Sequence, residues 1–150
     1  MSDFLRLPKK TLYALEAVVD VAYNARPDPV QSKDITKRQG IPPRYLEQAM
    51  QQLVHAGILK GVRGPRGGYT LARERRRITV AQIIQVIAAD EGDEDSRGSD
   101  IGERVVQPFW GEVQEELLGK LGAVTLEDLC NRAKAIGIGR AGDTASNFTI

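Results

Sequence analysis

The spacing of apolar and polar residues predicts short amphipathic helices in the first part of this chain. Apolar side chains recur at helical spacing over 11–23, and we expect a first helix there that stops before two closely spaced prolines. A shorter, polar helix is expected over 32–39, with Ser32 as its N-cap. Gly40 follows the last polar residue and predicts the end of that helix.

A third helix and a pair of strands are predicted next. The helix spans 44–56, begins behind the prolines at 42–43, ends at Gly57, and carries one apolar stripe made of Leu46, Ala49, Met50 and Leu53. Two apolar runs over 59–62 and 69–71 follow, separated by a glycine-rich basic segment, and they predict a small β-hairpin.

The pattern changes after the hairpin. Thr79 is placed to cap a helix that runs through Ala89 and turns three isoleucines inward, namely Ile83, Ile84 and Ile87. Residues 90–100 then form an acidic stretch with no apolar anchor, for which we expect a flexible loop.

The C-terminal part predicts one long helix and one short helix. The long helix spans about 101–121, with apolar side chains on or near one side: Val105, Val106, Phe109, Trp110, Val113, Leu117, Leu118 and Leu121. Thr125 and Asp128 have the spacing of a capping box, which opens a last helix to about Ala135. From residue 137 the glycine-rich end is expected to be a flexible tail.

A polar recognition-type helix followed by a basic hairpin is the layout of a winged helix-turn-helix domain. The predicted fold is therefore mainly α with a small β-hairpin wing. Its expected organisation is a winged helix-turn-helix domain over 1–89, an acidic loop over 90–100, a long helix with a short terminal helix over 101–136, and a tail over 137–150.

The net charge of +1 hides a division of charge along the chain. Residues 1–80 carry 15 Lys and Arg against 7 Asp and Glu, whereas residues 81–150 carry 6 against 13. A basic half that coincides with a helix-turn-helix pattern indicates a face for a polyanion. No apolar run has the length of a membrane span, and we expect a soluble, cytoplasmic protein.

Several separated motifs resemble the Rrf2 family of bacterial transcription regulators, in order and at family spacing. They are Arg6-Leu7, Lys10, Tyr13-Ala14, Arg38-Gln-Gly-Ile41, Tyr45-Leu-Glu-Gln48, Val62-Arg-Gly-Pro65 and Gly67-Gly-Tyr-Thr-Leu71. The resemblance runs from about Leu5 to Ala89 and continues more weakly through Trp110 and Thr125-Leu126. It implies a homodimer with two winged-helix heads on a palindromic DNA site, and it implies that the long helix within 101–136 is the dimerisation helix.

The third helix offers the side chains that read bases. A guanidinium such as that of Arg44 can bond guanine, Gln48 can bond adenine, and Glu47 can accept from the cytosine amino group. The resemblance implies DNA contacts at the same three positions and at Arg63, and Tyr45 belongs to the same motif. The segment 42–44 departs from the serine-bearing pattern of the family, which leaves the target sequence open. A solvated helix face is the alternative for Glu47 and Gln48.

The wing and the other basic residues are expected to contact the DNA backbone or the groove beside it. Arg63 and Arg66 lie between glycines, which let the backbone approach DNA closely; a solubilising hairpin tip is the alternative. Phosphate contact is expected, with a plain surface role as the alternative, at Arg6, Lys9, Lys10, Lys33, Lys37 and Arg38.

The sequence does not supply the ligands of an iron–sulfur cluster. Many members of the resembled family hold such a cluster through three cysteines in the segment that corresponds to 90–107, and this segment contains no cysteine and no histidine. Cys130 lies among apolar residues at helical spacing and is interpreted as a core residue, with a redox thiol as the alternative. His55 is assigned a packing or phosphate role rather than metal binding. We therefore expect no metal and no cofactor.

These observations predict a cluster-free, homodimeric DNA-binding repressor with a near-palindromic operator. Phe109 and Trp110 are expected in the dimer core, with a pocket for a small aromatic effector as the alternative. A second hypothesis is control of DNA binding by a partner protein at the acidic loop 90–100. An enzyme is not expected, because no motif pairs a nucleophile with a base.

Overall fold

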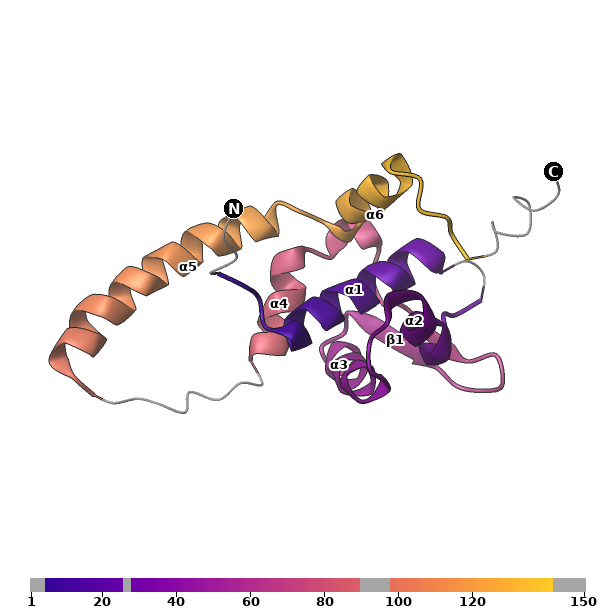
Figure 1. Ribbon diagram of the computed structural model, residues 1–150, viewed down its shortest axis with the longest axis horizontal. Coiled ribbons are helices and arrows are strands. Elements are labelled where there is room, and N and C mark those ends of the chain that lie inside the picture. The colour runs from indigo at the N-terminus through magenta and orange to yellow at the C-terminus, as the bar shows by residue number, and fades with distance from the viewer. Residues whose placement is uncertain (1–4, 26–27, 90–97, 142–150) are drawn as a thin grey trace.

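The computed structural model describes residues 5–25, 28–89 and 98–141. It is mainly helical and contains one two-stranded antiparallel sheet, as Figure 1 shows. This confirms the predicted fold class. The elements are α1 (Lys9–Asn24), α2 (Ser32–Gln39), α3 (Pro43–His55), β1 (Leu59–Val62), β2 (Gly68–Leu71), the 3₁₀ turn η1 (Arg75–Arg77), α4 (Val80–Ala88), the π-helical segment η2 (Gly102–Val106), α5 (Gln107–Gly122) and α6 (Leu126–Ala135).

Helices α1, α2 and α3 enclose the core of the N-terminal part. The predicted stripe of α3 is confirmed, because Leu46, Ala49, Met50 and Leu53 are all buried. Gly40 ends α2 in the left-handed conformation, with φ of 67°, and thereby makes the tight turn into α3. Helix α3 is short and its other face is polar, so the burial of this stripe against α1 is its main source of stability.

The expected N-cap of α2 is wrong by one residue. Gln31 occupies the N-cap position with extended backbone angles, and no side chain caps the helix. The cause is tertiary: the backbone of Val30 exchanges two hydrogen bonds with Tyr69 of β2, at N–O distances of 2.9 and 2.8 Å. This bridge keeps the chain extended through Gln31, so that Ser32 becomes the first helical residue instead of the cap.

The hairpin forms as predicted and is fixed by close backbone packing. Leu59 pairs with Leu71 and Val62 pairs with Gly68. Gly68 has a φ of 157° and faces the carbonyl oxygen of Val30, where a Cβ atom would collide. The glycine is therefore required for the approach of β2 to the segment before α2.

Two capping boxes mark the starts of helices α4 and α6. The hydroxyl of Thr79 accepts from the backbone N–H of Gln82, and Thr125 and Asp128 cap α6 in the same reciprocal way. Both predicted caps are confirmed. The backbones of Thr79 and Thr125 also form an isolated antiparallel bridge, which places the start of α6 beside the start of α4. Of the three isoleucines expected inward, Ile83 and Ile87 are fully buried, whereas Ile84 is half-buried.

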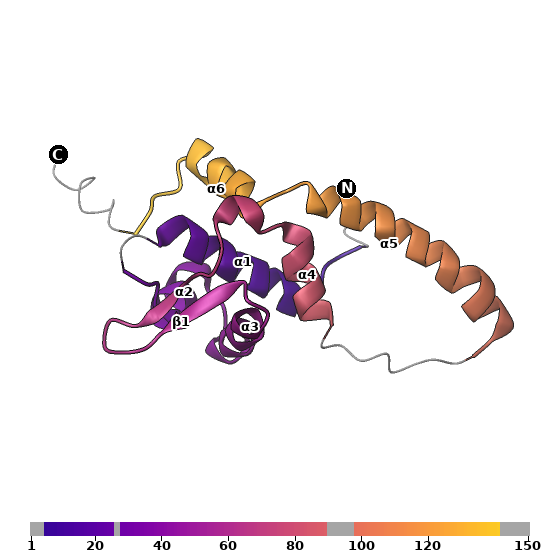
Figure 2. The same cartoon turned by 180° about the vertical axis from the view of Figure 1, so that it is seen from behind.

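Helix α5 extends as an arm away from the rest of the molecule, as both views show (Figures 1 and 2). Its C-terminal end packs against α4, and its first turns continue from the π-helical segment η2. No residue of α5 is buried in the single chain. The predicted long helix is confirmed, and Phe109, Trp110 and Leu117 on it remain exposed, whereas Val113, Leu118 and Leu121 are half-buried. Residues 90–97, the greater part of the expected acidic loop, lie outside the described residues.

The first residues of the predicted tail lie against α1. The Tyr23 hydroxyl donates a hydrogen bond to the carbonyl oxygen of Ile138, and the N–H of Ala141 donates to Oδ1 of Asn24 at 2.8 Å. Residues 142–150 of the expected tail are outside the described part of the chain. Among the described helices, none combines the length and apolarity needed to cross a membrane.

Candidate nucleic-acid interface

Helix α3 presents three of the predicted DNA-binding side chains on one exposed face. Arg44, Glu47 and Gln48 are exposed and line a shallow groove together with Gln51. Their spacing of three and four residues places them one turn apart on the same side of the helix. The opposite side is the buried stripe, so this face is fixed toward the solvent. The structure thus brings the three expected base-reading residues together.

Tyr45 links the first turns of α1 and α3. Its ring lies 5.8 Å from the ring of Tyr13, measured between centroids, and 46% of the residue remains exposed. Tyr13 lies one helical turn beyond Lys9 and Lys10 on α1. The ring contact therefore positions the basic start of α1 near the start of α3, on the same side of the molecule.

The start of α2 adds a second group of donors to this surface. Its first backbone N–H groups have no side-chain cap, and Lys33 stands exposed in its first turn. A groove between α2 and α3 is lined by Ser32, Lys33 and Glu47, among others, and reaches Tyr69 of the hairpin. Uncapped N–H groups at a helix N-terminus together with a nearby ammonium group can bind an anion such as a phosphate.

The wing places Arg63 and Arg66 in solvent beside the start of α2. Both residues are exposed, and Arg63 lines a hollow that also contains Gln31 and Ser32. The side-chain amide of Gln31 donates to the carbonyl oxygen of Pro65 at 3.4 Å, which connects the tip of the wing to the segment before α2. The hairpin and α3 lie on the same lower side of the molecule in both views (Figures 1 and 2).

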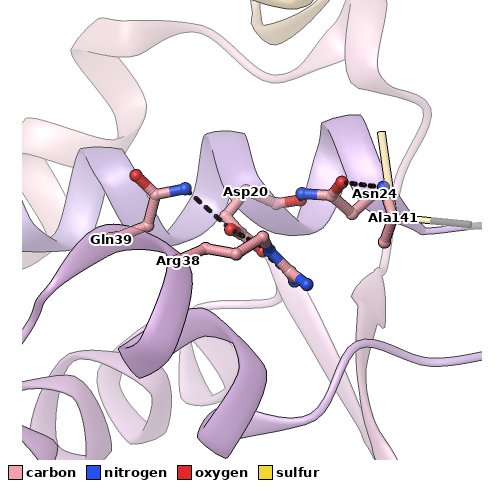
Figure 3. Close-up of polar contacts among 5 residues, drawn as sticks. All are labelled: Asp20, Asn24, Arg38, Gln39 and Ala141. Carbon is pink, nitrogen blue, oxygen red and sulfur yellow. Dashed lines mark hydrogen bonds and ion pairs between the residues drawn. The ribbon is translucent and has the colours of Figure 1, made fainter. Parts of the chain in front are cut away.

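Arg38, one of the expected phosphate contacts, is instead engaged by Asp20 of α1. Its Nε donates to Oδ2 at 2.9 Å and its Nη2 donates to Oδ1 at 2.8 Å, as Figure 3 shows. Gln39 donates to the same carboxylate at 2.8 Å. The Asp20 side chain is fully buried. The hydrogen bonds to its carboxylate raise the pKa of Arg38. The bidentate pair occupies two of the guanidinium donors inside the protein, and the phosphate contact expected at Arg38 remains a prediction.

Sequence reasoning missed two residues that shape this surface. Asp20 holds the end of α2, and the signal for it was an acidic side chain within the otherwise apolar stretch of α1. Gln31 holds the wing, but nothing in its local sequence distinguishes it from a loop residue. Its role depends on the bridge between Val30 and Tyr69, which joins segments far apart in the chain.

The described residues do not fit a metal or an iron–sulfur cluster. Cys130 is buried in α6, and burial raises the pKa of its thiol, which disfavours the thiolate that a cluster needs. His55 lies exposed at the end of α3. Over 5–25, 28–89 and 98–141, no group of three or more His, Cys, Asp or Glu side chains is arranged to hold a metal ion.

Comparison with known proteins gives one consistent family. The profile of the Rrf2 family, described as iron-dependent transcriptional regulators, matches residues 7–132. The HTH-type transcriptional regulator IscR of Xenorhabdus nematophila is 36% identical over 151 residues, covering 97% of this chain and 91% of its own length. IscR of Klebsiella pneumoniae is 36% identical over 140 residues, covering 89% of this chain and 85% of its own.

Solved structures agree with the sequence relatives. The IscR of T. potens has a TM-score of 0.73 and 35% identity, with 91% of this chain and 94% of that chain covered. CymR, the global cysteine regulator of B. subtilis, has a TM-score of 0.68 and 28% identity, with 86% and 98% covered. The match extends over the winged head and the long helix together.

Proposed function

This chain belongs to the Rrf2 family of transcription regulators, and we propose that it is a homodimeric repressor that binds a near-palindromic operator without an iron–sulfur cluster. The observation that carries the proposal is the exposed face of α3, on which Arg44, Glu47 and Gln48 lie beside the basic wing. A helix with such a face and a basic hairpin next to it matches the major groove and the adjacent backbone of duplex DNA.

In this proposal α3 supplies the base contacts. Arg44 bonds the O6 and N7 acceptors of guanine, Gln48 bonds adenine, and Glu47 accepts from the amino group of cytosine. Tyr45 packs on Tyr13 and holds the start of α3 in place, with its exposed edge toward the DNA. The prolines before α3 preset its first turn, so that Arg44 enters the groove on a rigid element.

The phosphate contacts come from three places around α3. The uncapped N-terminus of α2 and Lys33 bind one phosphate, and Lys10 at the start of α1 binds another. On the other side, Arg66 contacts the backbone and Arg63 enters the minor groove from the wing. These contacts would use part of the positive charge that residues 1–80 carry.

The homodimer is supported by the exposure of α5. None of its apolar side chains is fully buried in the single chain, and those far from α4 are the most exposed: Phe109 is 60% exposed and Leu117 is 53% exposed. Exposed apolar side chains along such an arm are stabilised by burial against a second surface, and a second copy of the chain can supply that surface by two-fold symmetry. Two heads related in this way bind half-sites about one helical turn of DNA apart.

The cluster-free state is supported by the chemistry of the available ligands. One buried thiol in α6 and one histidine at the end of α3 lie on different elements, and neither has a partner set. The description of the family as iron-dependent is therefore not extended to this chain. The alternative of a partner protein at the acidic loop 90–100 finds no specific support, since 90–97 lie outside the described residues.

The test is selection of genomic fragments by the purified protein, with the binding repeated at two salt concentrations. We expect a two-fold symmetric site whose half-sites are about one helical turn apart. Deletion of the gene should raise transcription from promoters that carry the site. Weak binding that enriches no sequence and collapses with salt would contradict the proposal, because it reports electrostatic attachment alone.

The role of Arg63 has its own test. Arg63→Ala should weaken binding to the selected operator by about 1–3 kcal/mol and random DNA by much less, because a groove contact is lost. Arg104→Ala, on the exposed segment η2, is the matched control and should leave both affinities unchanged. An equal loss on operator and random DNA makes Arg63 a phosphate contact and removes it from the readers.

A further inference from the structure

A cavity of about 400 Å³ lies between α1, α6 and the segment that follows α6. Helix α6 lies on the side of α1 away from α3 in both views, and none of the lining residues belongs to α3 or to the wing (Figures 1 and 2). The apolar wall has two aliphatic side chains from each of the three segments: Leu15, Val19, Leu129, Ala133, Ile136 and Ile138. Concave, mostly apolar spaces of this size are typical of sites for small organic molecules.

The C-terminal wall of the cavity is fastened to α1. Beyond the hydrogen bonds that join Tyr23 to Ile138 and Asn24 to Ala141, the guanidinium of Arg140 lies 5.2 Å from the centroid of the Tyr23 ring. These contacts join residues more than one hundred positions apart, and all of them involve the last turn of α1. The wall is therefore a built part of the fold.

The polar end of the cavity is already satisfied by contacts within the protein. The carboxylate of Asp20 accepts hydrogen bonds from Arg38 and Gln39, as Figure 3 shows. The amide of Asn24 is engaged on both sides, since it donates to the backbone carbonyl of Asp20 at 2.9 Å and accepts from the C-terminal wall. Among the described residues, the buried polar side-chain atom without a partner is Oε1 of Gln52, which lies outside this cavity. The buried side chains of the lining therefore leave no polar group for a ligand to satisfy.

The charged side chains of the lining do not favour either sign of charge. They are two carboxylates and two guanidinium groups, those of Glu16, Asp20, Arg38 and Arg132. Asp20 and Arg38 neutralise each other in a bidentate pair. Glu16 and Arg132 are exposed and opposite in charge. A charged ligand would therefore lose hydration in the apolar part of the cavity without gaining a buried counter-ion.

We propose that this cavity binds a small, neutral and mostly apolar organic molecule, held between α1, α6 and the C-terminal segment. Aliphatic side chains from three segments supply the hydrophobic contact. An apolar cavity of about 150 Å³ can hold one benzene molecule, so a space of about 400 Å³ has room for a ring that carries a short chain. Because the polar end is satisfied within the protein, shape and apolarity select the ligand, and charge does not.

The position of the cavity connects it to DNA binding, a step that rests on the proposed function. Asp20, Arg38 and Gln39 line its polar end, and their contacts fix the end of α2 just before the turn into α3. An apolar ligand displaces water from beside this network, and hydrogen bonds are stronger in less polar surroundings. The ligand therefore favours the placement of α2 and α3 that the closed network holds, and it should raise operator affinity by about five-fold or more.

The experiment uses three probes of similar shape that differ in charge: methyl 3-phenylpropanoate is neutral, 3-phenylpropanoate is an anion and 3-phenylpropylamine is a cation. Binding to the full-length protein without DNA is followed by methyl NMR. The neutral ester should shift the methyl signals of Leu15, Val19 and Leu129. It should bind about ten-fold more tightly than either charged probe, because the charged probes lose hydration without gaining a partner. Equal or tighter binding of either charged probe, or no binding of the ester, overturns the proposal.

Two variants with matched controls decide where the ester binds, once circular dichroism has shown that each is folded. Ala133→Trp fills the cavity and should abolish binding, whereas Ala135→Trp lies outside the lining and should bind the ester like the unaltered protein. Val19→Thr keeps the shape of the side chain but places a hydroxyl in the apolar wall, and it should weaken binding about ten-fold. Val54→Thr on α3, outside the lining, should leave binding unchanged. Unaltered binding in Val19→Thr, or equal losses in a variant and its control, contradicts the site.

Operator affinity with and without the ester separates this inference from the proposed function. If the ester binds and specific DNA does not, the DNA-binding proposal fails and the ligand site stands. If the operator binds and the ester leaves its affinity unchanged, the regulatory coupling is wrong. If the operator binds and no methyl signal moves with the ester, the site itself is wrong. Nuclear Overhauser contacts between protomers at Ile136 or Ile138 would show that a second copy covers the cavity, and they would also overturn the site.

Discussion

The buried ion pair between Asp20 and Arg38 gives an asymmetric prediction for stability. The two partners differ in exposure: the side chain of Asp20 is 0% exposed and that of Arg38 is 30% exposed. Arg38→Met keeps the aliphatic stem but leaves a buried carboxylate with Gln39 as its remaining side-chain donor. Asp20→Asn leaves a guanidinium that can turn toward water. Removing the cation should therefore destabilise the fold more than neutralising the acid.

The magnitudes follow from the same geometry. An uncompensated buried charge costs about 3–5 kcal/mol, and we expect this for Arg38→Met. Asp20→Asn retains an amide oxygen for Gln39 and should cost about 1–3 kcal/mol, the scale of a lost charged hydrogen bond. Because a domain of this kind has roughly 5–15 kcal/mol of stability in all, Arg38→Met removes a large part of it.

Urea unfolding followed by circular dichroism measures these differences, at one fixed protein concentration because a dimer couples stability to concentration. The double variant Asp20→Leu with Arg38→Met should be more stable than Arg38→Met alone, since no buried charge is left. A smaller loss for Arg38→Met than for Asp20→Asn would refute the reasoning. So would a double variant that loses as much as the sum of its single changes.

Three further outcomes are expected. Gly68→Ala should destabilise by about 1–3 kcal/mol in thermal unfolding, because a Cβ atom collides with the Val30 carbonyl, while Gly61→Ala, with nothing nearby, should change little. Since burial raises the pKa of Glu16, its charged form opposes folding above that pKa; Glu16→Gln should therefore stabilise near about pH 7, and the gain should vanish near about pH 3. A gain that persists in acid would contradict this cause. Phe109→Asp should give a folded monomer by sedimentation, and a persistent dimer would place the interface elsewhere.

Local signals in the sequence predicted the elements and the face of α3 well. Gly40 and the capping residues Thr79 and Thr125 act over three or four positions, so their roles are visible in the sequence itself. The same holds for Arg44 and Gln48, because helical spacing alone separates them from the buried stripe. The predicted site residues on α3 therefore lie together as expected.

Contacts between distant segments were not predictable in the same way. Arg38 looked like a free surface cation because its partner Asp20 lies 18 positions earlier on another helix. Ser32 looked like a cap because the bridge from Val30 to Tyr69 cannot be seen from the local pattern. In each case the tertiary partner changed the role of a residue whose local preference was clear.

The last two turns of α1 connect the end of α2 with the C-terminal segment, two parts of the molecule that are far apart in the sequence. Asp20 holds the end of α2 from one side of this segment, and Tyr23 and Asn24 hold the C-terminal residues from the other. A change in how the C-terminal segment is seated must act on the same helix that fixes the turn before α3. Coupling between two sites requires an element on which both act, and these turns of α1 meet that requirement. Within the described residues, the last two turns of α1 thus connect the C-terminal segment to the turn before α3, the helix that we propose contacts bases.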